Sequence, residues 1–279
     1  MPRLIGCAGL SHQRGTSMPR LLIALLATAM FAVTGCTSTS YDLMETSSVK
    51  KMRFKDNDPQ DFGRNHPGLH EVHGIDLSKW NDTDIDWTAV KRAGIAFVFI
   101  KGTEGKDRLD PAFRTHWQNA AAAGIPHAAY HFYYFCSSPE EQADWFIANV
   151  PKEANMLPPV LDMEWNHASP TCKLKPDAET VRASMQRFMD KVEAYYGKRP
   201  IIYTSVDFHR DNLVGAFPNY NFWLRAVAAH PSKIYGDRRW AFWQYTSTGI
   251  IPGIKGEMDI NVFSGTQKNW NSWVSAAAK

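Results

Sequence analysis

The residues best suited to chemistry in this chain are two acids, Asp162 and Glu164, at the end of the apolar stretch 159–165. This stretch predicts a buried β-strand, and because side chains alternate along a strand, the two carboxyl groups point to the same face. Two such groups suit the cutting of a glycosidic bond, in which one with a raised pKa protonates the leaving oxygen while the other stays ionised. The alternative is a strand end that carries two solvated acids, because the pattern D-x-E is common.

The elements that must position these acids begin near residue 71, where short apolar runs start to alternate with amphipathic segments. That alternation is typical of an α/β protein with parallel strands. We expect strands at 72–77, 95–101, 125–135, 160–164, 200–204, 222–226, 240–245 and 258–263, and helices at 85–94, 110–124, 138–149 and 177–196. The first five strands alternate with helices and the last three mostly do not. We therefore predict one barrel domain, residues 71–275, rather than an open doubly wound sheet, and no Gly-rich phosphate loop follows the first strand.

The strand ends carry most of the remaining candidate residues. In a barrel of parallel strands the functional groups lie at the carboxyl ends. The expected ends carry Asp76, Lys101, His131 or Tyr133, Asp162 with Glu164, Tyr203, Trp223 with Arg225, Gln244, and Asp259 with Asn261. Four carboxyl groups at three separate strand ends favour a functional cluster over solvated surface acids.

The N-terminal 35 residues have the pattern of a targeting segment. A basic residue, Arg20, precedes an apolar run that is too short for a comfortable membrane span. The true start is expected at Met18, and residues 33–36 resemble a bacterial lipobox in which Cys36 is acylated; an ordinary secretory signal with a chance cysteine is the alternative. Residues 36–70 are polar and of mixed charge, and we expect a flexible linker there.

The charge of the chain gives no sign of a nucleic-acid partner. The whole sequence has a formal net charge of +3, but residues 1–35 contain three arginines and no acids, so the remainder carries 28 basic and 28 acidic residues. We see no basic stripe. The histidines and cysteines do not follow a metal-ligand spacing, so we expect neither a metal nor a cofactor.

Two of the four cysteines fall in the globular part. Cys7 lies in the leader and Cys36 at the acylation site, whereas Cys136 and Cys172 each follow an expected strand on the same rim. In an oxidising envelope these two could form a disulfide, and two free thiols are the alternative.

Taken together, the motifs resemble those of glycoside hydrolase family 25, the Chalaropsis-type lysozymes. The resemblance covers about residues 72–273 and its motifs are 73–80 (HGIDLSKW), 99–105 (FIKGTEG), 110–113 (DPAF), 129–132 (AYHF), 161–164 (LDME), 200–204 (PIIYT), 242–245 (FWQY) and 259–263 (DINVF). It implies a modified (β/α)5β3 barrel and cleavage of the β-1,4 bond between N-acetylmuramic acid and N-acetylglucosamine in peptidoglycan. It also implies that Glu164 is the general acid/base and that Asp162, Asp76 and Asp259 are the other active-site carboxyl groups.

Two routes are open for the reaction. The acetamido oxygen of the substrate could attack its own anomeric carbon while Asp162 orients that group; direct attack by Asp76 or Asp259 is the rival. In either case we expect Asp162 to raise the pKa of Glu164 by repulsion.

Further residues are candidates for substrate binding. They are Tyr133, Tyr203, Trp223 and Trp243 as sugar-stacking rings, and His131, Arg225, Gln244 and Asn261 as polar contacts, with core packing or structural pairing as the alternative for the rings, His131 and Arg225. The expected protein is a monomeric muramidase, lipid-anchored in the cell envelope. A non-catalytic wall-binding protein, or a glycosidase for another amino-sugar polymer, are the alternatives.

Overall fold

The structure, a computed structural model, describes residues 52–277. Cys36 and the expected leader lie outside these residues. The main elements are β1 (Lys55–Asp56), β2 (His73–Leu77), α1 (Trp87–Ala93), β3 (Ile95–Glu104), β4 (Arg108–Leu109), α2 (Phe113–Ala122), β5 (His127–Phe132), α3 (Pro139–Asn149), β6 (Val160–Met163), α4 (Ala178–Tyr196), β7 (Ile201–Thr204), α5 (Val206–Phe208), β8 (Phe222–Arg225), α6 (Pro231–Ile234), β9 (Phe242–Ile250), β10 (Met258–Phe263) and α7 (Gln267–Ala277). Within residues 52–277, no helix is long and apolar enough to cross a membrane.

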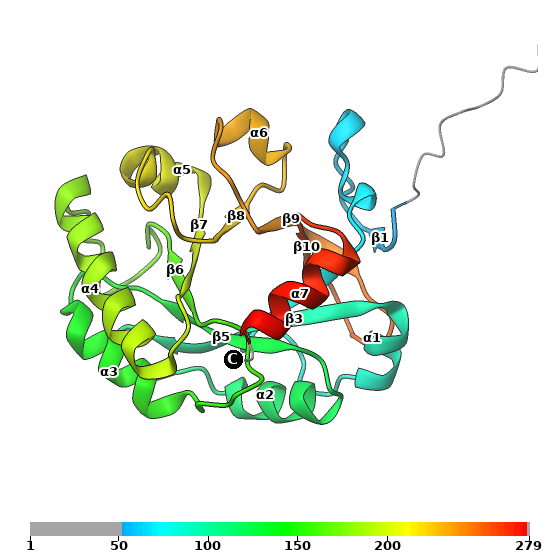
Figure 1. The fold of residues 1–279 in the computed structure, drawn as a ribbon, viewed down its shortest axis with the longest axis horizontal. Helices are drawn as coiled ribbons and strands as arrows, with labels where there is room; N and C mark the ends of the chain where they lie inside the picture. The colour runs from blue at the N-terminus through cyan, green and yellow to red at the C-terminus, as the bar shows by residue number, and fades with distance from the viewer. Residues whose placement is uncertain (1–51, 278–279) are drawn as a thin grey trace, which may run out of the picture. The chain divides into compact units, whose positions relative to one another are not determined.

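Eight strands close into a barrel in the order β2, β3, β5, β6, β7, β8, β9, β10 (Figure 1). Helices follow each of the first five strands, and β8 to β10 have little helix between them. The predicted (β/α)5β3 barrel is therefore confirmed. One expectation about its strands is wrong: β10 runs antiparallel to both neighbours, β9 and β2, while the other barrel pairs are parallel.

Local sequence signals explain the helix ends. The α3 helix begins with a capping box, in which Ser138 and Glu141 bond each other's backbone. Asp177 caps the start of α4, and α1 and α4 each end at a glycine, Gly94 and Gly197, in the left-handed conformation.

The buried side chains form two apolar layers. One fills the barrel and includes Phe97, Phe99 and Phe242. The other lies between the strands and the surrounding helices, and includes Phe146 and Phe188. Both faces of most strands are therefore covered, which is why their sequences are nearly continuous apolar runs.

The expected flexible linker does not extend to residue 70. Residues 55–56 add a short antiparallel strand, β1, to the edge of β9. Phe54 and Phe62 are 8% and 5% exposed, and the Phe62 ring packs edge-on against Trp243 with 5.0 Å between ring centroids. Two buried phenylalanines and a two-residue strand attach this segment to the barrel. Its polar composition did not indicate this attachment.

Candidate active site

The four predicted acids meet at one rim of the barrel. Asp76 lies in β2, Asp162 in β6, Glu164 directly after β6, and Asp259 in β10. Asp76 and Asp259 are paired across the β2–β10 ladder. Because β10 is antiparallel, it is the beginning of this strand, and not its end, that meets the carboxyl ends of the others.

A buried hydrogen-bond network holds Asp76. Its Oδ2 atom accepts hydrogen bonds from Gln244 Nε2 at 3.0 Å and from Asn261 Nδ2 at 2.8 Å. Tyr203 in turn donates to Gln244 Oε1 at 3.0 Å, and Trp223 donates to Asn261 Oδ1 at 2.7 Å. Tyr203 and Trp223 are 6% and 2% exposed, so they support the floor of the site, and their rings are not open to a sugar.

The pKa of Glu164 is raised to about 6, and burial is the main cause. The charge of Arg225 opposes this rise, Asp207 and Asp259 add to it, and Lys101 opposes it. Burial likewise raises the pKa of Asp259 to about 6, against the effect of Arg225. We expected repulsion by Asp162 to raise the Glu164 pKa, but burial dominates.

The two more deeply placed acids also favour the protonated form. Burial and then the charge of Asp259 raise the pKa of Asp76, and burial and then the charge of Glu164 raise that of Asp162. The Oδ1 atom of Asp162 is buried and has no hydrogen-bond partner among the described residues. A buried polar atom without a partner is costly, and the cost is larger for a charged oxygen, so this position of Oδ1 also favours the protonated form of Asp162.

Three predicted substrate-binding residues do not reach the acids, because they point to the outer side of their strands. His131 is buried between Thr103, at 2.7 Å, and Gln142, at 3.1 Å. Tyr133 is 2% exposed in the layer under the helices. Trp243 is fully buried in the same layer, and its Nε1 donates to the Ala226 carbonyl at 2.9 Å. All three side chains therefore pack in the core, which was the alternative to sugar contact.

Tyr130, and not His131 or Tyr133, is the residue of this segment that faces the acids. It is paired with Val160, and the adjacent inward residue Phe132 is paired with Asp162. Burial, and then the charges of acids including Asp76 and Asp162, raise the pKa of its phenol. Strand alternation could have identified Tyr130, since paired residues in a parallel sheet share a face.

Lys101, which the sequence placed at a strand end without a role, also belongs to the site. Its Nζ atom donates to Glu104 Oε2 at 2.7 Å and lies 4.7 Å from the centroid of the Phe132 ring. Its positive charge opposes the effect of burial on the pKa of both Asp162 and Glu164. Its location at the end of an expected strand was the available signal. Arg225 also acts on the acids, yet it forms no ion pair within 4.0 Å among the described residues.

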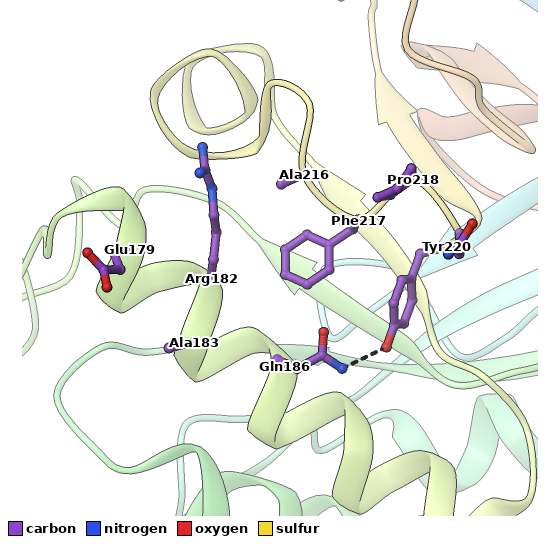
Figure 2. A pocket seen from close by; sticks show the side chains of 9 residues that line it. Glu179, Arg182, Ala183, Gln186, Ala216, Phe217, Pro218 and Tyr220 are labelled. Carbon is purple, nitrogen blue, oxygen red and sulfur yellow. Dashed lines mark hydrogen bonds between the residues drawn. The ribbon is translucent and has the colours of Figure 1, made fainter.

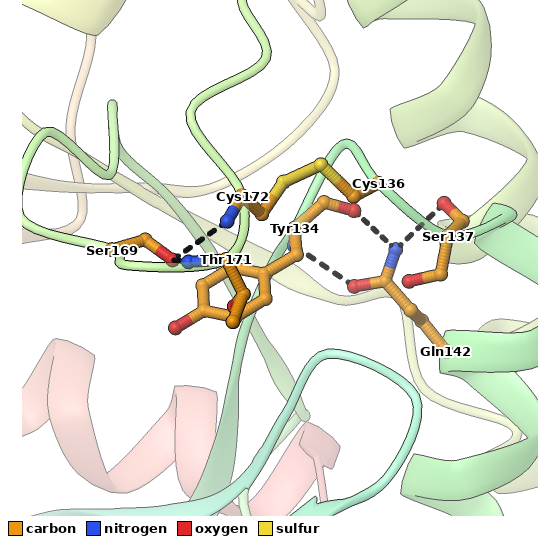
Figure 3. The surroundings of a disulfide bond; sticks show 7 residues. All are labelled: Tyr134, Cys136, Ser137, Gln142, Ser169, Thr171 and Cys172. Atoms are coloured by element: carbon orange, nitrogen blue, oxygen red, sulfur yellow. Dashed lines mark hydrogen bonds between the residues drawn. A yellow bond between two sulfur atoms is a disulfide. The ribbon is translucent and has the colours of Figure 1, made fainter.

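A disulfide joins the loops that follow β5 and β6. Cys136 and Cys172 are bonded, with 5.8 Å between their Cα atoms (Figure 3). Beside them, Gln142 donates to the Tyr134 carbonyl at 2.7 Å and accepts from the Tyr134 amide at 2.9 Å. The loop that continues from Glu164 is thus tied covalently to a firmly bonded turn.

A pocket elsewhere on the surface contains none of the four acids. It lies between α4 and residues 216–220, has a volume of about 830 Å³ and is lined partly by Arg182, Phe217 and Tyr220 (Figure 2). Gln186 donates to the Tyr220 hydroxyl there at 3.0 Å. Among the described residues, no group of three or more His, Cys, Asp or Glu side chains could hold a metal ion.

Comparisons with known proteins agree with this geometry. Residues 75–254 match the family described as glycosyl hydrolases family 25. The chain is 34% identical over 204 residues to lysozyme M1 of Streptomyces globisporus, covering 70% of this chain and 68% of that protein. It is 34% identical over 220 residues to YegX of Escherichia coli (strain K12), covering 75% of each. A solved family 25 glycosyl hydrolase from Bacillus anthracis aligns with a TM-score of 0.67 and 33% identity, over 75% of this chain and 96% of that one.

Proposed function

The chain belongs to glycosyl hydrolase family 25, and from this premise we propose that it is a peptidoglycan muramidase. It hydrolyses the β-1,4 bond between N-acetylmuramic acid and N-acetylglucosamine. The observation that carries the proposal is the meeting of Glu164, with a pKa of about 6, and three further carboxyl groups at one barrel rim. A lysozyme M1 relative supports the choice of substrate.

Glu164 is the general acid and base of this proposal. Its raised pKa keeps part of the enzyme protonated near neutral pH, so it can give a proton to the leaving glycosidic oxygen. The resulting carboxylate then takes a proton from the water that completes hydrolysis, which restores the starting state.

Asp162 assists through the acetamido group of the muramic acid residue. As the glycosidic bond breaks, the acetamido oxygen bonds to the anomeric carbon, and the N–H donates to the carboxyl group of Asp162, two residues before Glu164. Direct attack by Asp76 is less favoured, because its Oδ2 already accepts two hydrogen bonds and its pKa is raised. Asp259, with Asp76, then contributes to the electrostatic field of the site.

The cellular setting extends this proposal to the N-terminal segment. Acylation of Cys36 would anchor the enzyme to a membrane of the cell envelope, where its partner is the glycan strand of peptidoglycan. Cys36 lies outside the described residues, so this part rests on the lipobox-like sequence 33–36. The intact mass of membrane-extracted protein tests it: an unmodified N-terminus ahead of Cys36 contradicts acylation.

The central test is digestion of purified cell wall by wild-type protein and by Glu164→Gln. Loss of a general acid should lower the rate by about 10²- to 10⁴-fold, whereas the control Glu179→Gln, on the surface of α4, should match wild type. Mass analysis should identify N-acetylmuramic acid at the new reducing ends. Reducing-end N-acetylglucosamine, or equal turnover of chitin, would contradict the assignment.

A further inference from the structure

Trp80 is the most exposed of the large hydrophobic side chains in the described part of the chain. It is 84% exposed, in the turn between β2 and α1. An indole ring offers a large apolar area, and leaving it in water gives up the stabilisation that burial would bring. Packing within this molecule therefore does not account for a tryptophan at this position.

The turn that carries Trp80 is fixed. Asn81 Oδ1 accepts a hydrogen bond from the Ser78 amide at 2.8 Å, and the Asn81 amide donates to the Ser78 carbonyl at 3.0 Å. The Lys79 amide donates to Asp110 Oδ2 at 3.0 Å. Bonds on both sides of Trp80 thus hold the backbone that carries the ring, so binding through this residue need not order the backbone.

The same turn belongs to the rim that holds the acids. Trp80 follows Asp76 by four residues, so their Cα atoms lie at most about 14 Å apart. Asn81 Nδ2 also contacts the Met258 sulfur at 3.3 Å, and Met258 directly precedes Asp259. The turn that carries the exposed ring is therefore next to the Asp76–Asp259 side of the cluster.

One face of the indole is available for a ligand. The Lys79 ammonium group lies 4.9 Å from the centroid of the ring, a cation–π distance that restrains the ring from one side. Pyranose sugars have a face of C–H groups that stacks on aromatic rings. A polymeric glycan also extends beyond the two sugars whose bond is cut, so a ring at the rim can meet a more distant sugar.

We propose that Trp80 forms a distal sugar-binding subsite, stacking on a pyranose of the glycan strand outside the pair whose bond is broken. The subsite deepens the proposed function and rests on it. Its energetic effect is to strengthen the binding of long strands without contributing to the chemistry at Glu164.

The test compares Trp80→Ala with wild type on long glycan strands and on the shortest fragment that is cleaved. Loss of one aromatic stack should raise KM for long strands about tenfold. We expect kcat, and kcat/KM on the short fragment, to stay within about twofold of wild type. Trp80→Phe should recover most of the loss, and Val214→Ala, which removes another exposed apolar side chain, should change nothing.

Binding in the Glu164→Gln background separates this inference from the function itself. Trp80→Ala should weaken the calorimetric affinity of that protein for long strands, with an unchanged melting temperature. Equal affinities, or equal KM values in the first experiment, would overturn the subsite. A loss that is as large on the shortest fragment would place Trp80 at the scissile pair and would also overturn it. A wild-type protein that binds long strands through Trp80 but releases no sugar would instead contradict the proposed function.

Discussion

Asp76 and Asp259 are directly paired across the antiparallel strands β2 and β10. The reversal of one strand places two carboxyl groups side by side, at opposite ends of their own strands. Burial and this proximity both favour the protonated form of Asp76. Gln244 and Asn261 oppose that effect by donating to Asp76 Oδ2. The site therefore controls how many negative charges it holds through burial, mutual repulsion and two amides.

The pH dependence of catalysis should report the pKa of Glu164. The general acid must be protonated, so kcat/KM should fall as pH rises through about 6. Arg225 favours the ionised form, and Arg225→Gln should therefore raise this pKa and move the alkaline limb to higher pH. Arg92→Gln, on the exposed surface of α1, is the charge-matched control. A limb that stays in place or moves to lower pH would contradict the role given to Arg225.

Asp162→Asn should abolish activity and raise the free energy of unfolding. Burial raises the pKa of Asp162, so its ionised form destabilises the fold near neutral pH, and this penalty disappears below the ordinary value of 3.8, where the group is protonated in both states. We expect the free energy of unfolding at pH 7 to rise by about 1–3 kcal/mol, and the gain to shrink toward pH 4.

Denaturant unfolding at the two pH values measures this gain, and cell-wall digestion should show that activity is lost. Asp237→Asn, an exposed acid, controls for the change of net charge. If the variant is less stable than wild type at both pH values, the carboxyl group of Asp162 stabilises the folded state, which contradicts this prediction.

How far the sequence could predict the site depends on which faces of the strands are covered. In β6, two acids interrupt an apolar run and reveal the inward face, so Asp162 and Glu164 were placed together. In the aromatic run 130–135 every side chain is large, and its polar histidine, His131, lies on the covered outer face, where it contacts Thr103 and Gln142. That is why His131 and Tyr133 were proposed for the site where Tyr130 lies.

The direction of β10 did not follow from the expected strand bounds, because strands at 240–245 and 258–263 leave twelve residues between them, which is enough for a parallel crossover. In the structure β9 continues to residue 250, and only residues 251–257 connect it to β10. The connection therefore demanded an antiparallel pair. The attachment of residues 52–70 could not be predicted in this way. It depends on two aromatic side chains and a two-residue strand, and neither produces a periodic pattern in the sequence.

The disulfide should contribute strongly to stability. It closes a loop of 36 residues, for which the loop-entropy model gives about 3–4 kcal/mol. Replacing both Cys136 and Cys172 by serine should lower the free energy of unfolding by that amount. A reductant should destabilise wild type similarly and leave the double variant unchanged, and alkylation mass should show two free thiols only after reduction. Equal unfolding of the oxidised protein and the double variant would contradict a stabilising bond.

The segment before the barrel should behave as part of the folding unit, although it precedes the matched region 75–254. Phe62 is 5% exposed and packs against the fully buried Trp243, so Phe62→Ala leaves a cavity at the outer face of β9. Loss of a buried phenylalanine costs about 3–5 kcal/mol, and we expect the lower end for a ring at the edge of the core.

Met52→Ala, at an exposed position, should change stability by less than about 0.5 kcal/mol. Denaturant unfolding with a single transition, together with normal cell-wall digestion at 25 °C, is the expected result for Phe62→Ala. Unchanged stability would contradict a contribution of residues 52–70 to the stability of the barrel.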